Sequence, residues 1–222
     1  MELEPAAGRG WRPAGVGFVV TFVAGLVASS ALAKTSLYLP DASAAQLREY
    51  YTGSAAAVVT AAALQAVAAV CLAWFGVGLA RTLDPGGPVA RRVRWAGGAA
   101  AAAFGASVAL SLLLVAIADD AGDGTLKALG RLTLACGGAL HLTALGVLVW
   151  LVSRTGLPAG FRPRWALRFG LVLAPLLAVS LVSIVVTPVT RLEPLWRLLS
   201  AIWMIAVATA GRRRAVATVP QS

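Results

Sequence analysis

The chain has 222 residues, of which 59% are hydrophobic and 13% are charged, and its mean hydropathy is +0.82. A soluble domain carries about a quarter charged residues, so the composition excludes an ordinary soluble enzyme, a DNA-binding domain, a disulfide scaffold and a disordered chain. The formal net charge of +10 would indicate nucleic-acid binding in a soluble protein, but here the distribution of that charge is more informative than its sum.

Charge-free apolar runs of about 20 residues, the length that crosses a bilayer as a helix, recur along the chain. They predict an all-α, polytopic transmembrane bundle, a single integral membrane domain over residues 1–222, with six spans at 14–33, 55–80, 95–118, 132–152, 166–187 and 195–210. The sixth run is the shortest and has Arg197 near its start, so whether it crosses fully stays open. No Asp or Glu lies inside any of the six runs.

The segments between the runs alternate in charge. The N-terminal tail, the 81–94 loop, the 153–168 segment and the C-terminal tail together carry the whole excess of +10, and the opposite segments are balanced. By the positive-inside rule the arginine-rich side is cytoplasmic. Both termini are therefore predicted to be cytoplasmic, in a multi-pass protein of the inner (plasma) membrane that contacts the bilayer and its anionic head groups and binds no nucleic acid.

The first run also has features of a signal peptide. Arg9 and Arg12 precede the apolar stretch, and residues 31–33 resemble a signal-peptidase site. The apolar stretch is longer than a usual signal-peptide core, which favours a retained span. Cleavage of residues 1–33 stays open as the alternative.

The first, third and fifth runs open with Arg and Trp close together. Trp is enriched at head-group depth, and Arg is favoured on the cytoplasmic side. These residues are therefore predicted to be membrane-interface anchors; a lipid-binding site or an ancestral triplication is the alternative. They are Trp11, Arg12, Arg94, Trp95, Arg164 and Trp165.

A short amphipathic helix is expected in the outer loop between the first two runs. Ser43 and Gln46 have the spacing of a capping box, and Leu47, Tyr50 and Tyr51 follow at near-helical spacing. We expect this helix to pack on the mouth of the bundle.

Polar residues inside a membrane are costly and often functional. A speculative ligand-binding set comprises Gln65, Ser107 and His141, which lie at similar depth in the runs, and Ser180, which lies a turn or two outward in the fifth run. The alternative is that these side chains only form hydrogen bonds between helices. Because His141 is the single histidine, a multi-His metal site is excluded, and no catalytic residue, metal or cofactor is assigned.

Two stretches and a connecting pattern resemble those of a group of small actinobacterial membrane proteins. The stretches are 39–51, an outer helix between two spans, and 157–165, the entry to the fifth span; the pattern is the long Ala/Val second run that ends in an arginine-closed turn. Those proteins have around six helices and are known mainly as a family defined by a domain of unknown function. The resemblance implies a bacterial inner-membrane location and carries over no site residue.

The sequence does not determine a biochemical function. It favours a non-enzymatic interaction or envelope-associated membrane protein, with a protein partner or a homo-oligomer. The small residues Ala101, Gly105 and Ala109, four apart, favour a close-packed seam inside the bundle, and a homodimer face is the alternative. The alternative function is a small-molecule or lipid carrier with a mid-depth polar pocket around Gln65 and His141. An intramembrane enzyme is the least supported class, because it would have to use His141 or a thiol.

Overall fold

The computed structural model describes residues 11–35, 41–161, 163–184, 186 and 192–209, and within these ranges it contains helices and turns but no strand. Five of its helical segments are long and apolar enough to cross a membrane: Arg12–Leu32, Ala55–Leu83, Pro88–Ile117, Asp123–Gly156 and Arg164–Ile184. Each overlaps one of the first five predicted runs, which is consistent with a helical membrane protein. The sixth run coincides with a shorter helix of 17 residues.

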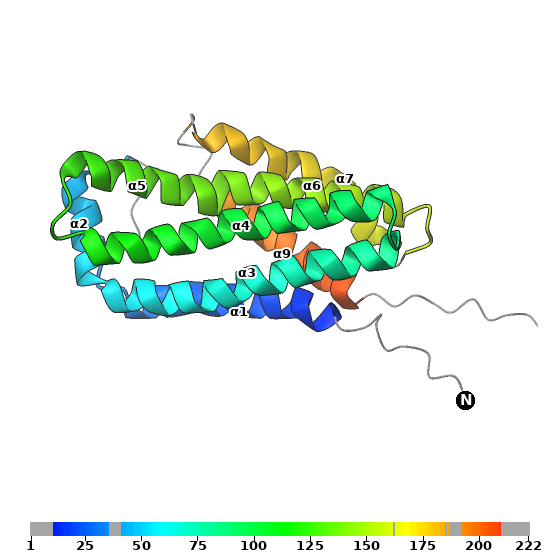
Figure 1. Cartoon of the computed structure of the whole chain (residues 1–222), viewed down its shortest axis with the longest axis horizontal. Coiled ribbons are helices and arrows are strands. Elements are labelled where there is room, and N and C mark those ends of the chain that lie inside the picture. The colour runs from blue at the N-terminus through cyan, green and yellow to red at the C-terminus, as the bar shows by residue number, and fades with distance from the viewer. Residues whose placement is uncertain (1–10, 36–40, 162, 185, 187–191, 210–222) are drawn as a thin grey trace, which may run out of the picture.

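The elements follow one another in chain order (Figure 1). They are α1 (Arg12–Leu32), α2 (Ala44–Gly53), α3 (Ala55–Leu83), α4 (Pro88–Ile117), α5 (Asp123–Ala135), the π-helix η2 (Cys136–Leu140), α6 (His141–Gly156), α7 (Arg164–Val179), the 3₁₀-helix η3 (Ser180–Ile184) and α9 (Glu193–Thr209). Segments α5, η2 and α6 form one continuous rod, and η3 continues α7 beyond Pro175, which lies inside the helix.

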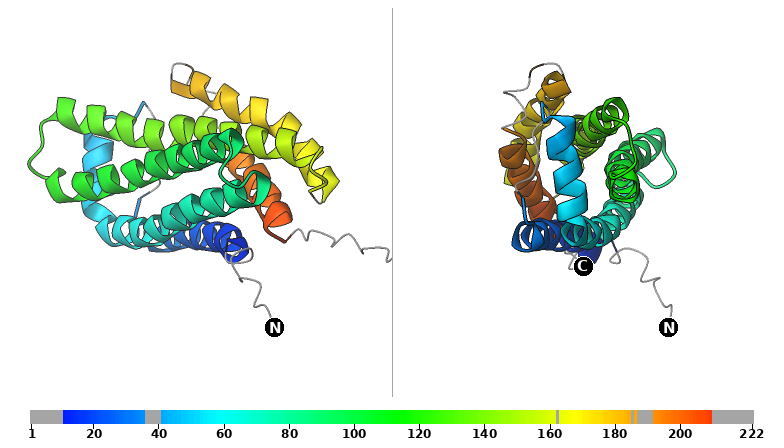
Figure 2. Two further views of the ribbon diagram at one scale, coloured as in Figure 1. Left: turned by 45° about the vertical axis from the view of Figure 1, so that its right-hand side comes forward. Right: turned by 90° about the vertical axis from the view of Figure 1, so that its left-hand side faces the viewer.

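The long helices form a closed ring. Helix α1 packs on α3, α3 on α4, α4 on α6, α6 on α7, α7 on α9, and α9 returns to α1. Figure 2 shows this ring from one end, with the short helix α2 lying across it. The ring places the first residues of α9 against the middle of the other helices.

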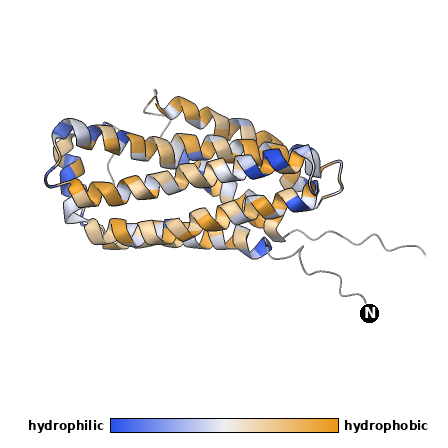
Figure 3. Ribbon diagram, in the orientation of Figure 1, coloured by the Kyte–Doolittle hydropathy of each residue, from blue (hydrophilic) through white to orange (hydrophobic). Residues whose placement is uncertain are grey.

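The two ends of the bundle are polar and the middle is apolar (Figure 3). The end away from α2, here called the arginine end, carries Arg81, Arg91, Arg94, Arg154 and Arg164. Helices α3, α4 and α5 extend past their apolar runs into these polar ends, because nothing in the flanking sequence stops a helix where the apolar residues stop. Helix α4, for example, begins at Pro88, a residue whose fixed φ suits the first helical position.

The apolar core is divided into two clusters. The larger cluster fills the ring toward the arginine end and includes Phe75, Phe104, Leu145 and Trp203. The smaller cluster lies under α2 at the other end, and includes Leu47, Tyr51, Leu114 and Leu126. Buried polar side chains, described below, lie between the two.

Helices α3 and α4 approach most closely where two glycines face each other. A Cβ atom on Gly97 would lie 3.0 Å from the Cα of Gly76, and a Cβ atom on Gly76 would lie 3.1 Å from the Cα of Gly97. The expected small-residue seam further along α4 is internal only at its start: Ala101 is buried in the core, Gly105 has no neighbour that its Cβ would meet within 4 Å, and Ala109 is exposed.

Helix α2 is fixed to the bundle by its cap and by one arginine. The predicted capping box is confirmed, because Ser43 accepts from the amide of Gln46 and Gln46 accepts from the amide of Ser43. Arg48 donates to the carbonyl oxygens of Ala118 (3.0 Å) and Ala121 (2.8 Å) in the α4–α5 turn, and its side chain lies 3.3 Å from Asp123. This set of bonds is called the Arg48 clamp below.

Candidate functional site

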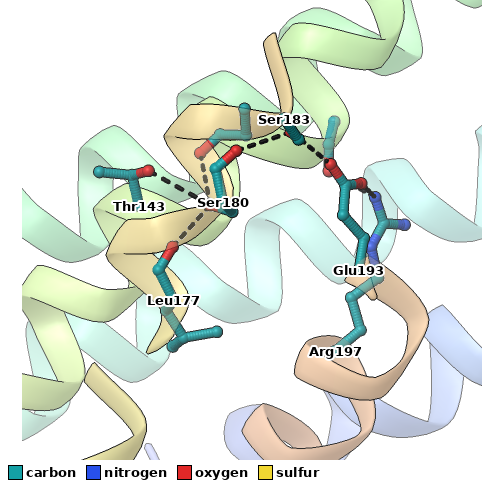
Figure 4. Close-up of polar contacts among 8 residues, drawn as sticks. Thr143, Leu177, Ser180, Ser183, Glu193 and Arg197 are labelled. Carbon is teal, nitrogen blue, oxygen red and sulfur yellow. Dashed lines mark hydrogen bonds and ion pairs between the residues drawn. The ribbon is translucent and has the colours of Figure 1, made fainter. Parts of the chain in front are cut away.

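A carboxylate and a guanidinium face each other in the first turn of α9. The Oε2 of Glu193 lies 3.4 Å from Nη2 of Arg197, one helical turn further on. The side chain of Glu193 is 10% exposed and that of Arg197 25% exposed. Figure 4 shows the pair and the hydroxyl groups that lead to it.

The pair lies near the middle of the bundle rather than at its surface. Glu193 sits against Gly138, where a Cβ atom would come within 2.7 Å of its Oε1. Gly138 is the sixteenth residue of the 34-residue segment Asp123–Gly156, so it is close to the midpoint of the longest rod. Helix α9 thus begins at mid-depth, with Glu193 turned toward the other helices and Leu192 and Leu195 exposed on the outer side.

Hydroxyl groups connect the carboxylate to neighbouring helices. Ser183 lies on η3, and its hydroxyl proton is shared between the carbonyl oxygen of Ser180 in the same 3₁₀ segment (2.6 Å) and Oε1 of Glu193 (3.0 Å). Ser180 lies within hydrogen-bond distance of Thr143 on α6 (3.3 Å) and of the carbonyl oxygen of Ala139 on η2 (3.2 Å). These bonds join α6, η2, η3 and α9 into one polar cluster.

The helices depart from regular α geometry at the level of this cluster. The π-helix η2 widens the rod at Cys136–Leu140, the 3₁₀-helix η3 tightens the end of α7, and α9 starts between them. Arg197 donates to the carbonyl oxygen of Gly137, inside the π segment, at 2.9 Å. π-helical turns occur frequently at functional sites, and irregular backbone at membrane depth is found where it is buried in protein or lines a site.

Of the residues predicted from the sequence, Ser180 belongs to this cluster and Ser107 borders it. Ser107 donates to the carbonyl oxygen of Phe104 in its own helix at 2.8 Å. Its Oγ lies 2.9 Å from where a Cβ atom on Gly137 would be, beside the carbonyl group that Arg197 contacts.

His141 lies one turn away, in the aromatic part of the core. It is 3% exposed, and its Nδ1 lies 2.9 Å from the carbonyl oxygen of Ala100, so Nδ1 carries the proton. The ring centroids of Phe104 and Phe18 lie 4.9 Å and 6.3 Å from that of His141. The imidazole of His141 therefore links α6 to α4 through this hydrogen bond.

Gln65 lies on α3, half-buried against α1. Its Cγ lies 3.4 Å from where a Cβ atom on Gly25 would be. Among the described residues it has no hydrogen bond to His141 or to the polar cluster. The proposed pairing of Gln65 with His141 is thus not a feature of this arrangement.

Sequence reasoning missed the two charged residues of the cluster. Glu193 was not among the predicted site residues, and Arg197 was noted only as a charge near the start of the sixth run. The available signal was their spacing of four residues at a predicted helix start, which pairs opposite charges on one face.

The predicted interface anchors fall into two groups. Trp95 and Trp165 at the arginine end are 74% and 56% exposed, and Arg94 and Arg164 beside them are exposed. Trp11 is 4% exposed; its ring packs on Phe75 at 5.7 Å, and its side chain occupies the space that a Cβ on Gly78 would need. Arg12 is half-buried next to it.

Comparisons with known proteins do not assign the cluster a chemistry. No family model matches the chain, and no curated protein or solved structure is significantly similar to it.

Proposed function

We propose that this protein is a carrier of the cell membrane that binds a small polar solute at the cluster around Glu193 and Arg197. The observation that carries the proposal is the buried ion pair at the level where η2, η3 and the start of α9 interrupt regular helix geometry. In membrane carriers, substrate sites lie near the bilayer midplane and are typically built from discontinuous helices. An ionisable pair at that depth is expensive to bury unless it is used.

The proposed topology has six spans, with the arginine end and both termini in the cytoplasm and α2 on the outer side. The charge distribution along the sequence and the exposed Arg–Trp pairs at one end of the bundle support it. Anionic head groups of the inner leaflet are the proposed partners of those arginines. The location in a bacterial inner membrane, and membership in the actinobacterial group that the motifs resemble, remain proposals based on the sequence.

Native mass spectrometry of protein released gently from its own membrane tests the carrier. The wild type is compared with the double variant Glu193→Gln/Arg197→Met, which removes both charges together and so leaves neither one unpaired. A matched control changes the same residue types at exposed positions, Glu49→Gln/Arg131→Met. We expect a defined small molecule to remain bound to the wild type and the control but not to the cluster variant. Identical bound molecules in all three forms would contradict the proposal.

A non-enzymatic interaction protein is the second candidate, favoured by one face of α4. Gly98 and Gly105 have no neighbour that an added Cβ would meet within 4 Å, and Ala102 and Ala109 on the same helix are exposed. Small residues let membrane helices approach closely, so this face suits another helix. Cross-linking through Gly98→Cys in the intact membrane would identify that helix, and an absence of any adduct would argue against this candidate.

A further inference from the structure

The polar cluster is electrically balanced. Helix α9 contributes Glu193 and Arg197, while η3 contributes the neutral Ser183 and η2 the carbonyl oxygen of Gly137. The titratable groups that the neighbouring elements add are the thiol of Cys136 on η2 and the ring of His141 on α6; α1 adds the uncharged ring of Phe22. Among the described residues, one negative and one positive charge therefore occupy this depth, and any ligand must preserve that balance because charge is costly in a membrane.

Arg197 has hydrogen-bonding capacity that the protein does not use. A guanidinium group has five N–H donors. The two bonds that Arg197 makes, to Gly137 and Glu193, both come from Nη2. Its Nε is buried and has no partner among the described residues. The guanidinium carbon lies 5.8 Å from the centroid of the Phe22 ring, and the side chain as a whole is 25% exposed.

Glu193 is placed differently. Ser183 occupies one carboxylate oxygen, Arg197 faces the other, and Gly138 presses against both. A cation would have to enter beside the charge of Arg197 and displace these contacts. An anion would meet a guanidinium with free donors, and the planar fork of that group matches a carboxylate or phosphate.

We propose that the solute is a small monoanion bearing a carboxylate or phosphate group, and that it binds Arg197 together with one proton that is taken up by Glu193. This inference rests on the proposed function of the cluster. The anion replaces Glu193 as the partner of Arg197, and a proton from water bonds to Oε2 of Glu193. The resulting carboxyl group stays bonded to Ser183 through Oε1. The anion and the proton together add no net charge, so the loaded and empty sites are equally neutral.

The test measures proton uptake during anion binding. Purified protein in nanodiscs is titrated by calorimetry with lactate and, separately, with inorganic phosphate at a pH well below its second ionisation, where it is a monoanion. Buffers of different ionisation enthalpy report the protons bound per anion, and the pH series uses lactate. We expect one proton per anion in the wild type. Affinity should then fall by about tenfold per pH unit above the titration of Glu193, the slope of a one-proton linkage.

The variant Glu193→Gln resembles the protonated carboxyl group, so it should bind the same anions with no proton uptake and little dependence on pH. The control Glu49→Gln should behave as the wild type. Anion binding by the wild type without proton uptake would overturn the inference and leave the proposed function intact. The inference would also be overturned, with the proposed function intact, if neither anion bound while native mass spectrometry found another solute at the cluster. If the cluster variants change neither readout, both proposals fail. The number of protons that the wild type binds per anion tests the inference even if Glu193→Gln folds poorly.

Discussion

The facing glycines of α3 and α4 offer the sharpest test of how this bundle is packed. In the variant Gly97→Ala, the new methyl carbon would lie 3.0 Å from the Cα of Gly76. Carbon atoms pack best about 3.5–4.0 Å apart, so the helices would have to separate by between about 0.5 and 1 Å at the crossing. Overpacking of this kind costs about 1–3 kcal/mol.

The neighbouring residue supplies the control. Gly98 is on the same helix, is exposed, and has nothing within 4 Å of an added Cβ. Both variants gain the same helix propensity from alanine, so the difference between Gly97→Ala and Gly98→Ala isolates the contact. For a chain of this length each kcal/mol lowers the Tm by about 2–4 °C. We expect Gly97→Ala to unfold several degrees below Gly98→Ala.

The assay uses a fluorogenic maleimide in a Cys71→Ser background, which removes the half-buried thiol, so that the remaining Cys136, buried in the folded protein, reacts when the bundle opens on heating. Gly76→Ala should resemble Gly97→Ala, because its Cβ would meet the other glycine at 3.1 Å. The double variant should cost less than the sum of the single ones, since one separation of the helices accommodates both methyl groups. Equal midpoints for Gly97→Ala and Gly98→Ala would refute this account of the interface.

Three further outcomes are expected. Burial raises the pKa of Tyr50 on α2, although its hydrogen bond with Ser29 opposes this; stability should therefore be maintained below pH 10 and decline as the pH rises above it, and a decline of the same size in Tyr50→Phe would contradict this. His141→Ala should lower the Tm, because it leaves a cavity and removes the bond to Ala100, without changing solute retention; loss of the solute would make His141 a binding residue. In a background without native cysteines, an impermeant thiol reagent applied outside cells should label Gly122→Cys but not Gly86→Cys, and the reverse pattern would invert the proposed topology.

Much of the fold could be predicted from local pattern. The first five spans follow from apolar runs that satisfy both the length of a bilayer crossing and the helix propensity of their residues. The cap of α2 followed from Ser43 and Gln46, three residues apart, because a capping box depends only on neighbours in the chain. Such features need no knowledge of the rest of the molecule.

The candidate site could not be predicted in the same way. The burial of Glu193 depends on where α9 begins within the ring, and Gly138, which makes room for it, is far away in the sequence. Trp11 shows the same limit: its pattern matched that of Trp95 and Trp165, but Gly78 on α3 leaves space that draws it into the core. How deeply a side chain is buried, and which residues it contacts, depend on the tertiary structure. A hydropathy pattern along the sequence does not contain this information.

The Arg48 clamp has a consequence for how this protein can change during evolution. Its two shorter bonds end on main-chain oxygens, those of Ala118 and Ala121, which every amino acid possesses. Substitutions in the α4–α5 turn therefore leave these two acceptors in place, whereas an insertion or deletion would move them away from the guanidinium. Homologues of this chain should accordingly vary in the amino acids of that turn while keeping its number of residues and the arginine at position 48 that donates to it.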